Sequence, residues 1–387
     1  MMKIPVYLDH HSTTPLDKRV LDEMMPYMTE KFGNPSSLDH GYGSEASSAV
    51  EMAREKISKS IGARREEIIF TSGATESDNL ALLGTMNKYA DRGNHLVTCT
   101  TEHKAVLDVT RHLETIGKQV TYVPVNEVGD IDMGTLEGAI TDRTVLISIM
   151  VANNEIGTIH NVAKIGKIAH ERNILFHTDA AQAAGHIPID VSAMNIDLMS
   201  FSAHKMYGPK GVGALYVRGL RPRVRPNPII HGGGHERNMR SGTLNVSGIV
   251  GFGKATEIAQ KEMHIENKRF KRWSKMIMDV FLDKGAMING STENRLAHNI
   301  SVCFPGIEGK AIINSVSKQI AISAGSACTT QTVEPSHVIL ALGFGEDRAH
   351  STIRAGLGRF NTEDEVQFFM DTVVEKIDLL SKIHSNT

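Results

Sequence analysis

A lysine stands where a short apolar segment of the chain ends. Lys205 follows Asp197 to Ser202, which reads as a buried strand, and it precedes a turn rich in glycine and proline at 207–211. Open α/β sheets bind ligands outside the carboxyl ends of their strands. A lysine that is partly desolvated there loses preference for its charged form, and the neutral amine can attack a carbonyl group. For an isolated lysine, a solvated surface position is the better interpretation.

A second predicted strand end carries groups that suit an anion. In Thr71 to Ser77, Gly73 allows close approach of the backbone immediately before a helix. The unpaired N–H groups of that helix, together with the Thr75 hydroxyl, form a ready anion site. A plain serine or threonine helix cap explains the same residues and, taken alone, is the commoner arrangement.

An acid follows a third predicted strand. Asp179, in the segment His177 to Gln182, could hold a ring nitrogen protonated through an ion pair, and a solvated loop aspartate is the alternative. Ser202 and His204, one strand over, could also reach a phosphate. A phosphate cradle, a strand-end acid and a strand-end lysine are together what pyridoxal phosphate requires. Each signal is weak alone, and jointly they predict a pyridoxal-phosphate site.

Seven apolar runs supply the strands that must bring these residues together. They lie at 67–71, 95–100, 119–125, 144–152, 174–178, 197–202 and 212–217. Helices are expected between several of them, at 74–83, 104–116 and 162–172. Continuous apolar strands that alternate with helices indicate a mostly parallel sheet covered on both faces. The predicted fold class is therefore α/β.

The pattern changes near residue 246, where a long helix is expected over 246–284. We predict a large domain at 16–258, which opens with a helix at 16–31, and a smaller α+β domain made of 1–15 and 259–387. The cleft between two such domains is the default place for a ligand.

The composition excludes several classes of protein. With 387 residues, 41% hydrophobic and 22% charged, the chain has the length for two domains and an ordinary globular balance. A formal net charge of −2 without long runs of one sign argues against nucleic acid or a membrane surface as main partner. No segment is apolar enough to span a membrane and the N-terminus is not a secretory signal, so we expect a cytoplasmic protein.

The three cysteines differ in their surroundings. Cys99 and Cys303 lie inside apolar strand runs, which predicts buried structural thiols. Cys328 lies in Ser323 to Gln331, a run of small and polar residues that predicts an exposed loop with a reactive thiol. An odd number of cysteines without a Cys-x-x-Cys pair excludes a disulfide framework and a cysteine zinc site, and fits a reducing compartment.

Over nearly its whole length the chain resembles the cysteine desulfurases of the NifS/IscS type. These proteins are class V pyridoxal-phosphate enzymes. The matching motifs are 7–9 with 13–15, 32–37, 71–79, 101–106, 153–157, 177–182, 200–213, 231–243, 323–328 and 353–354. The resemblance implies the fold type I architecture of pyridoxal-phosphate transferases, with the catalytic cysteine loop at about 323–334 in the small domain.

The resemblance also implies a role for each residue of the site. Lys205 is the Schiff-base lysine and moves the α-proton, Asp179 pairs with the pyridinium nitrogen, and Gln182 hydrogen-bonds the ring hydroxyl. His103 is a catalytic residue that stacks on the cofactor ring. The phosphate is bound by Ala74, Thr75, Ser202 and His204, and by Thr243 of the neighbouring subunit. The substrate is bound by Asn154, which lies over the cofactor, and by the guanidinium fork of Arg354.

The implied reaction converts L-cysteine to L-alanine and leaves a persulfide on Cys328. The expected partners are a second copy of the chain and a sulfur acceptor, namely an iron–sulfur scaffold protein, a tRNA thiolation enzyme or another carrier. No metal is expected, although Cys328 could ligate a nascent iron–sulfur cluster. The alternatives are a selenocysteine lyase, another class V aminotransferase, and a non-catalytic sulfur carrier that retains only the fold.

The sequence departs from the family pattern at two places near the site. His10 and His11 precede Ser12 where relatives carry other residues, and a metal site or local packing would explain the pair, with local packing favoured. Ala203 stands where relatives have glycine, a change that a contact through the backbone N–H would survive.

Overall fold

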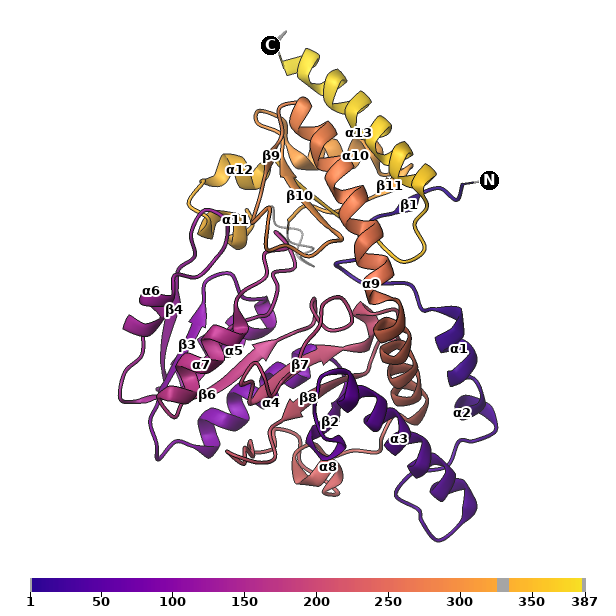
Figure 1. Cartoon of the computed structure of the whole chain (residues 1–387), viewed down its shortest axis with the longest axis vertical. Coiled ribbons are helices and arrows are strands. Elements are labelled where there is room, and N and C mark those ends of the chain that lie inside the picture. Colours follow the sequence, from indigo (N-terminus) through magenta and orange to yellow (C-terminus); the bar gives the residue numbers. More distant parts are fainter. Residues whose placement is uncertain (1, 326–333, 385–387) are drawn as a thin grey trace.

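A seven-stranded sheet forms the centre of the computed structural model, which describes residues 2–325 and 334–384 (Figure 1). Its strand order is β2-β8-β7-β6-β5-β3-β4. The strands are β2 (Ile68–Thr71), β3 (His95–Cys99), β4 (Gln119–Val123), β5 (Thr144–Ser148), β6 (Leu175–Asp179), β7 (Leu198–Ser202) and β8 (Gly213–Val217). Only β8 is antiparallel to its neighbours. The predicted α/β fold with a mostly parallel seven-stranded sheet is confirmed.

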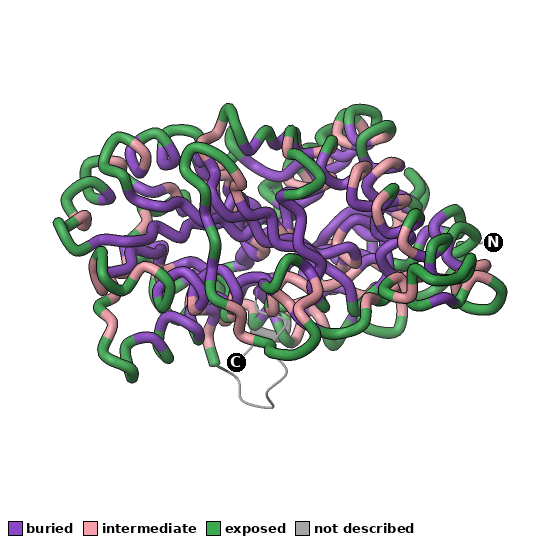
Figure 2. Tube along the Cα trace, turned by 90° about the horizontal axis from the view of Figure 1, so that it is seen from below, coloured by how far each residue is buried: buried purple, intermediate pink, exposed green. Residues whose placement is uncertain are grey.

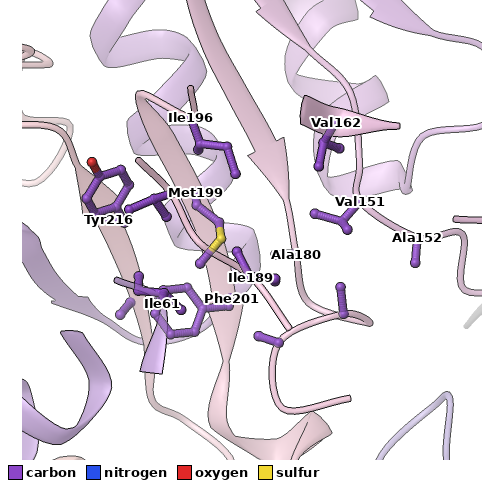
Figure 3. Packing of buried hydrophobic residues seen from close by; sticks show 14 of the residues in the cluster. Ile61, Val151, Ala152, Val162, Ala180, Ile189, Ile196, Met199, Phe201 and Tyr216 are labelled. Atoms are coloured by element: carbon purple, nitrogen blue, oxygen red, sulfur yellow. The ribbon is translucent and has the colours of Figure 1, made fainter. Parts of the chain in front are cut away.

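Helices bury both faces of this sheet. Met199 and Phe201 point to one face and pack in a core with α1 (Lys18–Met24), α3 (Gly41–Ser60), α7 (Val162–Glu171) and the first half of α9 (Val246–Asp283) (Figure 3). Leu198 points to the opposite face, where α4 (Ala74–Lys88) and α5 (Lys104–Thr115) pack. Burial on both faces explains the continuous apolar runs, and Figure 2 shows buried segments through the centre of the molecule with exposed ones around them.

A second hydrophobic core lies at the far end of α9. Its elements are β9 (Met287–Ile288), β10 (Asn299–Cys303), β12 (Thr352–Gly356), α10 (Gly309–Val316) and α13 (Glu363–His384). Phe270, Trp273 and Phe281 of α9 pack in this core, so one helix connects both cores (Figure 1). The predicted long helix is thereby confirmed. The predicted domain boundary at 258 falls inside α9 and stays a prediction.

The first strand of the chain belongs to the second core. β1 (Val6–Tyr7) pairs in parallel with β11 (Ile320–Ala321), and Val6 and Leu8 are fully buried there. The sheet β12-β10-β9 beside them is antiparallel throughout. The segment that follows β1 then crosses back to the large sheet, which places residues 9–14 between the two cores.

The predicted single helix at 16–31 is wrong. Two helices are present, α1 and α2 (Pro26–Thr29), because a proline lacks the N–H for an intrahelical bond and starts a helix more readily than it continues one. The remaining short elements are α6 (Met133–Gly138), α8 (His235–Asn238), α11 (His337–Ala341), α12 (Glu346–His350), η1 (Arg65–Glu67) and η2 (Ala203–Lys205). Within the described part of the chain, no helix has both the length and the apolar character to cross a membrane.

Candidate active site

The carboxyl ends of the central strands surround a cavity of about 540 Å³. β6 ends at Asp179 and β7 ends at Ser202, and the two strands are direct neighbours. The predicted site residues that line this cavity are Ala74, Thr75, His103, Asn154, Asp179, Gln182, Ser202, His204 and Lys205. Residues from distant parts of the sequence meet here because parallel strands end at the same edge of a sheet.

The turn between β2 and α4 forms an anion-binding wall of the cavity. The first turn of α4 leaves the N–H groups of Ala74 and Thr75 without intrahelical partners, at the positive end of the helix dipole. Gly213 of β8 lies directly behind this turn, since a Cβ there would come within 2.6 Å of the Gly73 Cα. Because neither glycine has a side chain, β8 packs directly against the turn. The turn is thereby held with the N–H groups of Ala74 and Thr75 at the cavity.

Lys205 ends η2 with its side chain in the cavity. Its Nζ donates to the backbone carbonyls of His11 and of Ser12, the latter at 2.9 Å. Burial lowers the pKa of Lys205 to about 8, and the nearby Arg354 cation adds to the effect. The amine is therefore far closer to its neutral, nucleophilic form at neutral pH than an exposed lysine.

Two buried carboxyl groups lie beneath the cavity. Asp179 Oδ1 accepts the Ala181 N–H at 2.8 Å, and burial raises the pKa of Asp179 while the charges of His103 and Lys205 oppose the rise. Asp78, on α4, has no hydrogen bond of good geometry on either oxygen within the described residues, although its Oδ1 lies 3.6 Å from His177 Nε2. Burial and the charge of Asp179 raise the pKa of Asp78 well above its usual value, which favours the neutral acid.

His103 is the N-cap of α5 and lines the same cavity. Its Nδ1 accepts the Ala105 N–H at 3.1 Å, so in the neutral ring the proton lies on Nε2. The ring is open to the cavity although protein surrounds it on most sides, and this desolvation lowers its pKa. His103 can therefore present a neutral aromatic face to a bound ring.

Gln182 is held by the segment that crosses between the cores. Its Nε2 donates to the His11 carbonyl at 2.9 Å, and its Oε1 lies 3.0 Å from His11 Nδ1. His10 packs edge-on against Tyr7, with ring centroids 4.9 Å apart. Both histidines thus make local packing and hydrogen-bond contacts, and no group of three or more metal-ligating side chains occurs in the described residues.

Arg354, in β12, reaches the cavity wall from the second core. Its Nη2 lies 3.1 Å from Asp9 Oδ1 and 3.0 Å from Ser12 Oγ, and its Nη1 donates to the Asn154 carbonyl at 3.0 Å. Arg354 is almost fully buried, and its Nε has no partner among the described residues. The guanidinium group therefore lies directly behind Ser12 and Asn154, which line the cavity.

Two predicted site residues are not among those that the structure places at the cavity. Thr243 is exposed and does not line the cavity of its own chain, so its predicted contact with a neighbouring subunit stays a prediction. Cys328 lies outside the described residues. The last described residue before it is Gly325, whose carbonyl accepts from Arg354 Nη1 at 3.2 Å. Cys99 and Cys303 are buried, as predicted.

The structure adds residues that sequence reasoning missed. Ser12, Thr13 and Asp78 line the cavity, and Thr13 Oγ1 lies 3.1 Å from His204 Nδ1. Thr13 belongs to a motif of the resemblance, which was a usable signal. Asp78 stands among polar residues at the start of α4, where nothing in the pattern indicates burial.

The residues of the cavity fit pyridoxal phosphate. The unpaired N–H groups of α4 suit the phosphate, the buried Lys205 amine suits the aldehyde carbon, and Asp179 suits the ring nitrogen. The buried Asp78 carboxyl next to Asp179 lies 3.6 Å from His177 Nε2 and makes no hydrogen bond of good geometry among the described residues, which leaves this polar site short of partners without a ligand.

Known proteins resemble this chain along nearly its whole length. The family described as class V aminotransferases matches residues 6–369. The cysteine desulfurase IscS of Rickettsia conorii is 50% identical over 390 aligned positions, which cover 99% of this chain and 93% of that protein. A solved NifS-like protein has a TM-score of 0.91 at 40% identity, covering 97% of this chain and 100% of the other. SspA in complex with cysteine has a TM-score of 0.80 at 38% identity, covering 92% and 99%.

Proposed function

The chain belongs to the class V aminotransferase family, in which its relatives are cysteine desulfurases, and we propose that it converts L-cysteine to L-alanine and a persulfide on Cys328. The observation that carries this proposal is the meeting of Lys205, Asp179 and His103 around one cavity whose wall is backed by Arg354. The enzyme uses pyridoxal phosphate, which when bound withdraws electrons from the bonds at the substrate Cα and Cβ.

Each side chain then has a task that its geometry supports. Lys205 attaches the cofactor and moves the α-proton, as its lowered pKa favours. Asp179 holds the ring nitrogen protonated, and His103 covers the ring. Arg354 takes the substrate carboxylate through its fork, which lies beside Asn154 and Ser12.

Sulfur transfer balances without an external oxidant or reductant. The Cys328 thiolate attacks the sulfur of the substrate, and a sulfur–sulfur bond forms as the carbon–sulfur bond breaks. The electron pair of the broken bond stays with the substrate carbon, which takes up a proton to give alanine. The persulfide on Cys328 then carries the sulfur to an acceptor thiol.

The wider role that we propose is sulfur supply for iron–sulfur cluster assembly and for tRNA thiolation. The names of the relatives support a cysteine desulfurase of the IscS type. A homodimer in the cytoplasm agrees with the exposed position of Thr243 and with three cysteines that form no pair motif. Cys328 could also ligate a nascent cluster while it is transferred.

The test is incubation of the purified protein with L-cysteine, followed by alanine assay and mass spectrometry of the Cys328 peptide. One added sulfur on that peptide, with stoichiometric alanine, is expected. Cys328→Ser should abolish both, whereas Cys303→Ser, which alters a buried thiol, should leave them unchanged. Absence of the added sulfur would overturn the proposal. Alanine formed only from selenocysteine, or amino transfer that survives Cys328→Ser, would identify the corresponding alternative.

A further inference from the structure

A chain of buried hydrogen bonds leads from Arg295 to the cofactor cavity. Arg295 Nη2 lies 2.6 Å from Asn299 Oδ1, and Asn299 Nδ2 lies 3.1 Å from His11 Nε2. His11 Nδ1 lies 3.0 Å from Gln182 Oε1, and Gln182 lines the cavity. Four side chains from three distant parts of the sequence are thus connected in series.

The direction of this chain is fixed at the arginine end. A guanidinium group carries only donors, so the atom of Asn299 that faces Arg295 must be the amide oxygen. The amide nitrogen of Asn299 therefore faces His11, and it also donates to the Glu155 carbonyl at 3.2 Å. A nitrogen that donates to His11 Nε2 requires that this ring nitrogen carry no proton.

The opposite end fixes the same direction independently. Gln182 donates through Nε2 to the His11 carbonyl, which can only accept. The amide oxygen of Gln182 therefore faces His11 Nδ1, which must carry the proton. Both ends assign His11 the same neutral form, with its proton on Nδ1.

The surroundings of His11 keep it in that neutral form. Burial lowers the pKa of His11 well below its usual value, and the Arg354 and Lys205 cations lower it further. Its ring stacks on His298 with centroids 4.6 Å apart, and His298 stacks on His186 at 4.3 Å. The stack fixes the plane of the ring, so its two nitrogens point along the hydrogen-bond chain.

Arg295 is suited to anchor the chain because no described carboxylate competes with the Asn299 side chain for it. It is buried, its other acceptors are the carbonyls of Asn289, Ser291 and Asn299, and no carboxylate pairs with it among the described residues. A guanidinium group that does not form an ion pair still donates all its hydrogens in fixed directions.

We propose that Arg295, Asn299 and His11 are positioning residues for the reaction. Their hydrogen-bond chain acts together with the His11 carbonyl to hold the Gln182 amide so that an N–H group, and never the oxygen, faces the hydroxyl oxygen of the cofactor ring. One N–H of this amide is bound to the His11 carbonyl, and the other has no acceptor among the described residues. The inference rests on the proposed function, which places the hydroxyl oxygen of the cofactor ring beside Gln182.

Such a donor has a measurable effect on the cofactor. An N–H group that donates to the hydroxyl oxygen of the cofactor ring stabilises negative charge on that oxygen. The oxygen then binds less tightly the proton that it shares with the Lys205 nitrogen. His11→Phe keeps the stack on His298 and the backbone carbonyl that accepts from Gln182, but it loses both ring hydrogen bonds. The Gln182 amide is then held by one hydrogen bond in place of two, so the pH midpoint of the visible absorption change should rise by about one unit. His298→Phe is the matched control, because it keeps an aromatic ring in the stack and lies outside the chain.

Two measurements on the holoenzyme decide the proposal. In nitrogen-15 NMR, His11 should show a proton on Nδ1 alone, and Asn299→Asp should convert it to the doubly protonated ring because a carboxylate then faces Nε2. In the spectrum, combining His11→Phe with Gln182→Leu should shift the midpoint no further than Gln182→Leu does.

A proton on Nε2 in the wild-type protein, or additive shifts in the double variant, would overturn the proposal. So would a midpoint in His298→Phe that moves as far as that in His11→Phe. Neither measurement involves sulfur transfer, so a protein that gave both expected results without sulfur on Cys328 would contradict the proposed function alone.

Discussion

Arg354 and Asp9 form an ion pair of 3.1 Å between residues that are 345 positions apart. The pair lies where the crossing segment passes between the two cores, and the same guanidinium group contacts Ser12 at the cavity wall. The other terminal nitrogen, Nη1, donates to the Asn154 and Gly325 carbonyls, so the guanidinium group is held on both of its ends directly behind the cavity wall. One side chain therefore joins the two ends of the chain at the wall of the cavity.

Replacing Arg354 should weaken substrate binding more than it slows the chemistry. In Arg354→Lys a bidentate, charge-assisted contact with the substrate carboxylate is lost, and kcat/KM for L-cysteine should fall about 30- to 100-fold, mostly through KM. Asp9→Asn keeps the guanidinium and should cost less than about 10-fold. Steady-state alanine release measures both. Equal losses in the two variants would contradict a direct role of Arg354.

Attachment of the cofactor should follow the titration of Lys205. The pKa of this buried amine is lowered to about 8, so in cofactor-free protein the rate of cofactor attachment should rise with pH and level off above about 8. An ordinary lysine would keep accelerating towards its usual pKa of 10.5. Stopped-flow absorption at a series of pH values measures this, with Lys205→Ala as the blank. Arg354→Gln should move the midpoint upward because it removes a neighbouring cation.

Asp78 should behave as a neutral acid in the cofactor-free protein. Its pKa in the folded state is well above 3.8, so the folded state binds more protons and loses stability as pH rises above about 4. Asp78→Asn removes this titration. As pH rises, the free energy of unfolding of Asp78→Asn should therefore increase relative to that of the wild type, by about 1.4 kcal/mol for each unit by which the pKa of Asp78 is raised. The difference between their melting temperatures should grow accordingly. A difference that does not change with pH would contradict a neutral Asp78.

The substitution Gly213→Ala should disturb the anion-binding wall of the cavity. The added Cβ would lie 2.6 Å from the Gly73 Cα and 2.7 Å from the Phe201 carbonyl oxygen. Overpacking of this kind costs about 1–3 kcal/mol, and a displaced Gly73 turn should weaken cofactor binding about 10-fold. Gly138→Ala, with nothing within 4 Å of the new Cβ, is the control. Titration of the stripped proteins with pyridoxal phosphate measures the effect, and equal affinities would count against it.

The sequence predicts the sheet well because both faces of its strands are buried. Apolar runs such as Leu198–Ser202 need no partner to be recognised, and a lysine or an aspartate at the end of such a run is readily found. The antiparallel direction of β8 could also be predicted from the sequence. The connection from Ser202 to Gly213 is too short for the crossover that a parallel neighbour requires.

The contacts that complete the site could not be predicted from local patterns. Arg354 meets Asp9, and Asn299 meets His11, only after two distant segments have packed together. The local pattern around Asp78 does not indicate burial, because a buried acid on a polar helix turn looks like a solvated one. The break of the first helix at Pro26 was readable from the sequence, since proline removes the hydrogen bond that a continuous helix needs.

The pairing of β1 with β11 also bears on how the protein is made. A ribosome adds about 5–20 residues per second, so Val6 waits on the order of twenty seconds to a minute before Ile320 exists. During that time the large sheet can form, whereas His11 and Ser12 have no second core to hold them against Lys205. Arg354 is synthesised later still. The cofactor site can therefore be completed only after Arg354 has been made, so cofactor binding at the finished site is a late step of maturation.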